Sequence, residues 1–165
     1  MELLAPAGNF EKFKTALYFG ADAVYLSGKN FGLRAFAGNF SNEEILKATS
    51  YAHRLNKKVY VTLNIVAKDE DFIHLDEYLD FLVKAGVDGL IVSDVGLIYY
   101  IRKYAPCLDV HVSTQANVIN SKSAAFFADM GVKRIVLARE LSLEQIKNIR
   151  KNIRWFWNKW IRFSK

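Results

Sequence analysis

Residues 110–118 read VHVSTQANV, and this stretch is the most informative part of the sequence for the fold. Apolar and polar side chains alternate along it, which is typical of a β-strand with two unlike faces. Its polar face carries His111, Ser113, Gln115 and Asn117. Strands of a parallel sheet are normally apolar on both faces, so a polar row in such a sheet needs a reason. We interpret the row as one wall of a ligand-binding mouth.

Short apolar strands alternate with amphipathic helices on both sides of this stretch. The same glycine-led joint recurs between a helix and the next strand, at residues 20–22, 86–88 and 131–133. Strands are expected over 3–5, 23–26, 58–63, 89–92, 110–118 and 134–137. Helices are expected over 10–19, 42–55, 71–85, 95–104, 121–130 and from 143 onward. This alternation predicts an α/β fold with parallel strands.

A barrel and an open doubly wound sheet are the two candidate architectures. No G-x-G-x-x-G motif follows the first strand, which weakens the dinucleotide-binding version of the open sheet. Polar residues follow nearly every strand, and a barrel gathers all of those ends at one mouth. We therefore predict an incomplete TIM-like (β/α) barrel of about six units. Either the chain is a fragment, or its tail and a partner or a second copy cover the open edge.

Composition changes sharply near residue 150. The chain has 165 residues and a net charge of +6. Residues 151–165 contain five basic side chains, no acidic one and all three tryptophans, whereas residues 1–150 hold 18 basic and 17 acidic side chains. We therefore divide the chain into a partial barrel, residues 1–150, and a basic aromatic tail, residues 151–165.

Several classes of protein are disfavoured by the sequence. No apolar run reaches the about 18 residues of a membrane span, and the start has no basic segment typical of a signal peptide, so we expect a cytoplasmic protein. The single cysteine, Cys107, cannot hold a zinc ion or an iron–sulfur cluster by itself. The three histidines fit no ligand spacing. We expect no metal and no cofactor on this chain.

Other candidate residues lie where strands end or in a long loop. Asn64 and Asp94 follow the third and fourth strands, and Asp94 is equally suited to cap the next helix. Arg34 and Asn39 lie in the glycine-containing connection 27–41, and ligand contacts concentrate in such loops. Arg34 is suited to an anion, with a solvated loop charge as the alternative.

Two charged residues end the sixth strand. Arg139 offers a planar fork for a carboxylate or phosphate, and Glu140 could act as a general base. The alternative is a local ion pair. A serine-peptidase arrangement of Ser113 with His111 is a weak match, because side chains two apart on a strand lie about 7 Å from each other.

Five separate segments, in order, carry a resemblance to a known family: residues 2–9 (ELLAPAGN), 20–25 (GADAVY), 34–41 (RAFAGNFS), 111–115 (HVSTQ) and 137–142 (LARELS). Together they resemble the collagenase-like peptidases of unknown catalytic type, peptidase family U32. The resemblance covers residues 1 to about 149 and implies a TIM-barrel-like domain. Proteins of this family are described as peptidases. Similar proteins act in hydroxylation of tRNA or ribosomal RNA bases and in ubiquinone synthesis, some with an iron–sulfur cluster.

The resemblance implies a peptidase, with a protein or peptide as substrate. The first alternative is an enzyme of RNA-base hydroxylation or ubiquinone synthesis that lacks its cysteine-bearing half, and the second is an inactive fragment. In this framework Glu140 and His111 are the catalytic candidates, and the other candidates bind substrate. The family's later cysteine signature has no counterpart in residues 151–165. We interpret this tail as the product of a frameshift or truncation, with a short variant as the alternative.

Overall fold

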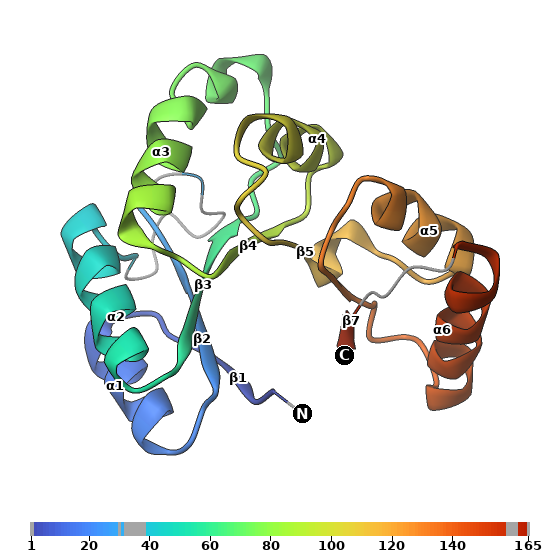
Figure 1. The fold of residues 1–165 in the computed structure, drawn as a ribbon, viewed down its shortest axis with the longest axis horizontal. Helices are drawn as coiled ribbons and strands as arrows, with labels where there is room; N and C mark the ends of the chain where they lie inside the picture. The colour runs from blue at the N-terminus through green and yellow to red at the C-terminus, as the bar shows by residue number, and fades with distance from the viewer. Residues whose placement is uncertain (1, 30, 32–38, 158–161, 165) are drawn as a thin grey trace.

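The computed structural model describes residues 2–29, 31, 39–157 and 162–164, and for residues 154–157 and 162–164 it describes the backbone alone. One parallel sheet runs through the molecule, with its strands in chain order from β1 to β7 (Figure 1). The strands are β1 (Leu4–Pro6), β2 (Ala23–Ser27), β3 (Lys58–Leu63), β4 (Gly89–Val92), β5 (Val110–Val112), β6 (Arg134–Val136) and β7 (Arg162–Ser164). The sheet curls into a half-barrel, which confirms the predicted fold class.

Helices connect successive strands and lie on the outer, convex side of the sheet (Figure 1). The α-helices are α1 (Phe10–Tyr18), α2 (Asn42–Arg54), α3 (Leu75–Ala85), α4 (Val95–Tyr104), α5 (Ser121–Asp129) and α6 (Leu143–Trp157). Two short 3₁₀ helices are η1 (Asp69–Phe72) and η2 (Thr114–Ala116). Of the helices in the described part of the chain, none has the length and apolar character needed to cross a membrane.

Local sequence signals set where the helices begin. The Ser41 hydroxyl accepts a bond from the backbone N–H of Glu44 at 3.2 Å, and the Glu44 carboxylate accepts one from the backbone N–H of Ser41 at 2.8 Å. Ser142 and Gln145 make the same reciprocal pair at the start of α6, at 3.3 and 2.8 Å. These capping boxes confirm two predicted helix starts, because each satisfies backbone donors that the first turn leaves unpaired.

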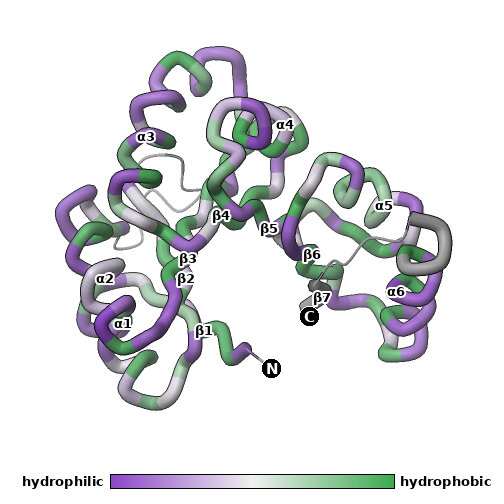
Figure 2. Tube along the Cα trace, in the orientation of Figure 1, coloured by the Kyte–Doolittle hydropathy of each residue, from purple (hydrophilic) through white to green (hydrophobic). Residues whose placement is uncertain are grey.

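Alternate residues of each strand face opposite layers. On β3, Val59, Val61 and Leu63 are fully buried in the core between the sheet and the helices, whereas Tyr60 belongs to a separate cluster inside the curl. Hydropathy follows this arrangement, since the central strands are mostly apolar and the helices alternate between polar and apolar residues (Figure 2). The apolar outer layer thus fixes the strands, and the inner layer is left to carry polar side chains.

The strand predicted over residues 110–118 is shorter in the structure. β5 ends at Val112, and the Ser113 hydroxyl then accepts a bond from the backbone N–H of Gln115 at 3.4 Å, starting η2. Asn117 ends this turn with φ = +51°, a left-handed conformation that asparagine tolerates. The prediction of one continuous strand was wrong because serine and asparagine compete for backbone hydrogen bonds and favour turns.

The structure also refines two of the predicted helices. The helix expected over 71–85 is divided into η1 and α3. Asn120, and not Ser121, caps α5 by accepting bonds from two backbone N–H groups at 2.9 and 3.0 Å. The last helix, α6, runs through residue 150 to Trp157, and β7 pairs with β6.

Candidate functional site

The carboxyl ends of neighbouring strands lie at one edge of the sheet. The last residues of β3, β4 and β5 are paired with one another in the parallel register. The residues that follow them therefore stand next to each other at this edge: Asn64, Ser93 and Ser113. The backbone N–H of Ser113 donates to the carbonyl of Val92 at 2.8 Å, which holds the two segments together beyond their last paired residues. We call this place the mouth edge.

Asn64 is the residue at the mouth edge with an unused polar atom. Its side-chain Oδ1 is buried and has no hydrogen-bond partner among the residues that the structure describes. A buried acceptor without a partner costs about 1–3 kcal/mol, which a donor from a ligand would recover. Asn64 therefore places a free hydrogen-bond acceptor at the mouth edge.

Asp94 and Ser113 have structural partners. Asp94 Oδ1 accepts a bond from the backbone N–H of Leu97 at 2.9 Å and caps α4, which is the alternative that the sequence offered for it. The Ser113 hydroxyl begins η2, and Ser113 is only 4% exposed. Both side chains therefore shape the loops around the mouth edge through their hydrogen bonds to the backbone.

Four more predicted residues are exposed in two turns that follow the strands. Gln115 and Asn117 belong to and end η2, and Arg139 and Glu140 form a turn after β6. The Thr114 hydroxyl donates to the carbonyl of Leu137 at 3.4 Å, which links the two segments. The structure thus brings η2 against the strand that leads into the Arg139–Glu140 turn.

Of the two candidates in the long loop, Asn39 and Arg34, the structure describes Asn39. Asn39 is half-buried and directly precedes Phe40, which forms an isolated parallel bridge with Gly28 after β2. This bridge places Asn39 close to the carboxyl end of β2. Arg34 lies outside the described residues.

His111 lies one layer deeper than the mouth edge, inside the curl of the sheet. It is 3% exposed, and its ring meets the ring of Tyr60 edge-on with the centroids 4.6 Å apart. Arg134 pairs with His111 in the register, and its guanidinium carbon lies 5.6 Å from the centroid of the Tyr60 ring. Glu2 accepts bonds from Arg134 Nη1 at 2.5 Å and from the Tyr60 hydroxyl at 3.1 Å. We call these four residues the inner polar cluster.

Electrostatics fix the charges of three members of the inner polar cluster, Glu2, Tyr60 and Arg134. Burial raises the pKa of Glu2, but the hydrogen bond and the charge of Arg134 outweigh this, so the pKa of Glu2 lies below its usual value. Burial, assisted by the negative charge of Glu2, raises the pKa of Tyr60 to about 12. At neutral pH the cluster therefore contains a carboxylate, a guanidinium and a neutral phenol.

The sequence interpretation missed Glu2, Tyr60 and Arg134 as members of a cluster. The sequence signal for two of them was a polar side chain at a strand position where a parallel sheet normally has an apolar one. Arg134 begins a strand, and Tyr60 alternates with fully buried valines. Because Glu2 and Arg134 are 132 positions apart, no local pattern could pair them. Within the described ranges no group of three or more His, Cys, Asp or Glu residues is placed to hold a metal ion.

A cavity of about 620 Å³ lies beside the connections that follow β2 and β3. Aromatic and apolar side chains line it together with three carboxylates and a histidine: Phe31, Asn42, Ile65, Glu70, Asp71, His74, Glu77, Tyr78 and Phe81. The Tyr78 hydroxyl is buried without a partner in the described chain, and burial raises its pKa. Among the described residues that line this cavity, none was predicted from the sequence as a site residue.

A half-barrel of parallel β/α units with polar residues at one edge defines a class of barrel proteins whose site lies at the carboxyl ends of the strands. Within this class the chain belongs to Peptidase family U32, whose model matches residues 8–159. The resemblance drawn from the sequence is confirmed.

Curated relatives are similar over nearly the whole chain but have different names. The chain is 44% identical over 152 residues to "tRNA hydroxylation protein P1" of Bacillus subtilis, which covers 92% of this chain and 36% of that protein. It is 45% identical to "Uncharacterized protease MJ0090" of Methanocaldococcus jannaschii, over 93% of this chain and 37% of that protein. It is 39% identical to "23S rRNA 5-hydroxycytidine C2501 synthase" of Escherichia coli, over 90% of this chain and 22% of that protein. The chain thus spans about a third or less of these relatives.

A solved structure, that of the U32 peptidase Mk0906, has the same fold. It superposes with a TM-score of 0.78 at 18% sequence identity, over 99% of this chain and 67% of that chain. At this identity the superposition supports the architecture and not the chemistry.

Proposed function

We propose that this chain forms the barrel part of an enzyme that hydroxylates RNA bases. The observation that carries the proposal is the 44% identity, over 92% of the chain, to a relative named for tRNA hydroxylation. A second relative named for a ribosomal RNA hydroxycytidine supports the same class of substrate. An enzyme that acts on tRNA works where tRNA is, so we expect the protein in the cytoplasm.

The mouth edge offers groups suited to an RNA base. A base presents N–H donors and carbonyl acceptors along its edges, and an amide side chain pairs with both. Asn64 has a buried Oδ1 that is free to accept such a bond, and Gln115 presents a second amide in the exposed turn. Arg139, exposed after β6, is suited to a phosphate or carbonyl. We propose these three residues as substrate contacts and Glu140 as the candidate for moving a proton.

A peptidase is the second candidate function, because another relative of similar identity is named as a protease. A hydrolytic mechanism needs an activated nucleophile with a base in reach. The Ser113 hydroxyl is engaged in the cap of η2. Cys107 is exposed and precedes β5, so it lies at the opposite end of the strand from the mouth edge. The proposal of RNA hydroxylation therefore stands ahead of peptidase activity.

An iron–sulfur cluster, present in some similar proteins, does not fit this chain's own residues. Such a cluster is held by several cysteine thiolates, and the sequence has a single cysteine. We therefore propose no cofactor on these 165 residues. The role assigned to the chain is to bind and orient the substrate at the mouth edge.

A chimera tests the proposal. The matched segment of the Bacillus subtilis tRNA hydroxylation protein P1 is replaced by this chain, and the chimera is expressed in a strain that lacks the native gene. Mass spectrometry of nucleosides from its tRNA is expected to show the modified base, with the mass gain of one oxygen atom. A parallel incubation of the purified chain with casein tests the peptidase.

The result that contradicts the proposal is a soluble chimera, produced at the level of the native protein, that leaves the tRNA unmodified. Cleavage of casein by the purified chain, abolished by Glu140→Ala, would establish the peptidase instead. The matched control is the native protein expressed from the same vector.

A further inference from the structure

A hollow of about 480 Å³ lies on the outer surface between α1 and α2, and none of the mouth-edge residues Asn64, Ser93 and Ser113 lines it. Its lining combines aromatic, aliphatic, hydroxyl and cationic side chains and contains no carboxylate: Phe10, Leu46, Lys47, Ser50, Tyr51 and Arg54. We call it the α1–α2 groove. Its chemistry differs from that of the cavity beside β3, which is lined by three carboxylates.

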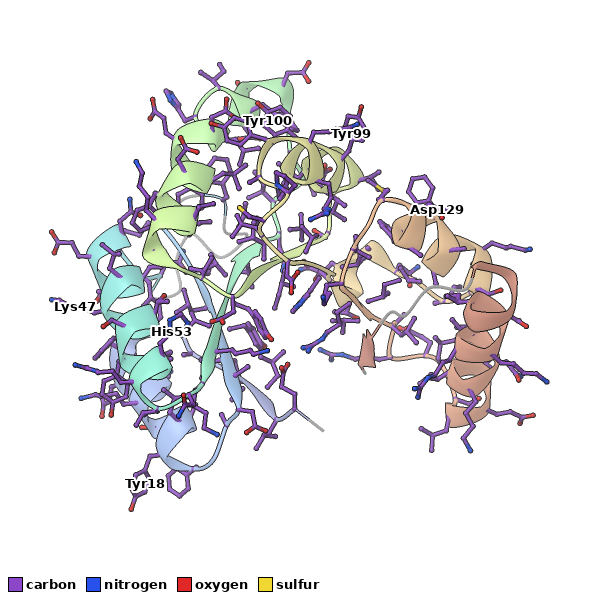
Figure 3. The ribbon with its side chains drawn as sticks, in the orientation of Figure 1. Tyr18, Lys47, His53, Tyr99, Tyr100 and Asp129 are labelled. Atoms are coloured by element: carbon purple, nitrogen blue, oxygen red, sulfur yellow. The ribbon has the colours of Figure 1, made fainter. Side chains whose placement is uncertain are left out.

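Cations stand over the aromatic rings of the α1–α2 groove. The Lys14 ammonium lies 5.7 Å from the centroid of the Phe10 ring, and the Arg54 guanidinium carbon lies 5.8 Å from that of Tyr51. The two rings meet edge-on, with centroids 6.4 Å apart. Lys47 projects outward from α2 (Figure 3). The groove is therefore bordered by three positive charges around two aromatic rings.

Among the residues that the structure describes, none of Lys14, Lys47 and Arg54 forms an ion pair. Because no carboxylate lines the hollow, the charged side chains that border it are cations. A polyanion is the ligand that this arrangement favours.

We propose that the α1–α2 groove binds a single-stranded segment of RNA. RNA suits both halves of the surface, since its phosphates pair with lysine and arginine, and its bases can stack on the Arg54 guanidinium and contact the parts of the half-buried Phe10 and Tyr51 rings that line the hollow. An acidic peptide offers charge but no flat ring for Phe10 and Tyr51, and a membrane surface is too flat for a groove between two helices. This inference rests on the proposed function, for which it names the docking surface.

The position of the α1–α2 groove suits an RNA that also reaches the mouth edge. Phe10 is the first residue of α1, and only three residues separate α1 from the end of β1 at Pro6. Both helices run from the carboxyl edge of the sheet toward the opposite edge, and Arg54 ends α2. The groove therefore begins beside Phe10, at the end of α1 nearest the carboxyl edge of the sheet, and follows α2 on the outside of the barrel as far as Arg54.

Fluorescence anisotropy of a labelled, unmodified tRNA transcript with the full chain tests this inference. Lys47→Glu with Arg54→Glu is expected to weaken binding by at least about tenfold at low salt, and to reduce the salt slope by about one for each phosphate that the variant no longer neutralises. Ser50→Asp adds a negative charge between the two cations without removing either, and it is expected to weaken binding in the same direction. The matched control is Lys84→Glu with Lys103→Glu, an equal change of charge on α3 and α4.

Three results would overturn the proposal that the α1–α2 groove binds RNA. They are an equal loss of binding in the control variant, unchanged binding in the variant of Lys47 and Arg54, and no binding of tRNA by the native chain. Binding of polyglutamate or anionic vesicles as tight as that of tRNA would overturn RNA as the ligand. Thermal unfolding checks that each variant is folded. The two proposals can fail separately. Weakened RNA binding in the variants together with an inactive chimera would support the α1–α2 groove and contradict RNA hydroxylation. Unchanged RNA binding in the variants together with an active chimera would support RNA hydroxylation and contradict the α1–α2 groove.

Discussion

The carboxylate of Glu2 and the guanidinium of Arg134 are 132 positions apart in the chain and 2.5 Å apart inside the curled sheet. Glu2 precedes β1, and Arg134 is the first residue of β6, so this ion pair connects the first and sixth β/α units across the interior. The Arg134 side chain is 7% exposed and that of Glu2 is 19% exposed. The pair therefore helps to fix the curvature on which the mouth edge depends.

Replacing Glu2 by glutamine should destabilise the protein by roughly 1–3 kcal/mol, because Arg134 is left with its charge buried and only a neutral partner. The measurement is the free energy of unfolding from urea titrations at neutral pH. Glu11→Gln, which neutralises an exposed carboxylate of α1, is the control and should change it by less than about 0.5 kcal/mol. Equal effects of the two substitutions would show that the ion pair contributes nothing measurable.

The same pair predicts the dependence of stability on pH. Since the pKa of Glu2 is lower in the folded chain than the ordinary value of 4.5, its contribution is present above that value and is lost as the pH falls through the lowered folded pKa. The difference in unfolding free energy between the native chain and Glu2→Gln should therefore shrink below about pH 4.5. A difference that stays constant down to pH 3 would contradict the lowered pKa.

Much of the fold could be predicted because its signals are local. The glycine joints, the capping boxes at Ser41 and Ser142 and the apolar strands each depend on residues a few positions apart. The interior could not be predicted, because the contact of Glu2 with Arg134 depends on how far the sheet curls. The stretch after Val112 misled for a related reason: alternation of polarity does not separate a strand from a turn stabilised by serine and asparagine.

The candidate site was predicted in part. The parallel register brings Asn64 next to Ser113, which the order of strands implies, but the unsatisfied Oδ1 of Asn64 depends on the packing of its neighbours. The sequence placed His111 on the polar face of its strand. Its burial against Tyr60 could not be predicted, because Tyr60 comes from β3, which is separated from β5 by β4. Three-dimensional contacts of this kind leave no pattern in one sequence.

Gly28 and Tyr78 form a close contact that a larger residue would break. A Cβ atom at Gly28 would lie 2.2 Å from the Tyr78 hydroxyl oxygen and 3.3 Å from its Cζ. Gly28→Ala should therefore destabilise the protein by about 1–3 kcal/mol, measured as the free energy of unfolding. Tyr78→Phe alone should be neutral or stabilising, because it removes a buried hydroxyl that has no partner among the described residues.

Combining the two substitutions provides the control for this contact. In the double variant the atom that clashes most is absent, so the effect of Gly28→Ala should fall to less than half of its value in the native background. Simple additivity of the two effects would show that the Tyr78 hydroxyl is not what excludes a side chain at Gly28.

Asp94 should behave as a helix cap. Asp94→Ala removes the acceptor of the Leu97 N–H bond and should cost about 0.5–2 kcal/mol of unfolding free energy, whereas Asp94→Asn keeps an acceptor and should cost much less. In the chimera, the asparagine variant should also keep its tRNA modification. An asparagine variant that is stable but inactive would instead make the carboxylate of Asp94 part of the chemistry.

Asn64 should show the opposite behaviour, with a loss of activity and little loss of stability. Its Oδ1 makes no hydrogen bond within the described structure, so Asn64→Ala removes no protein contact of that atom and should change the unfolding free energy by less than about 1 kcal/mol. Loss of one hydrogen bond to the substrate corresponds to a reduction of about tenfold in modified tRNA formed per unit time by the chimera. Asn42→Ala, at an exposed position of α2, is the matched control and should leave the rate unchanged. If Asn64→Ala unfolds the chain, or if the two variants modify tRNA at the same rate, then Asn64 is a structural residue and the mouth edge loses the side chain that most directly links it to a substrate.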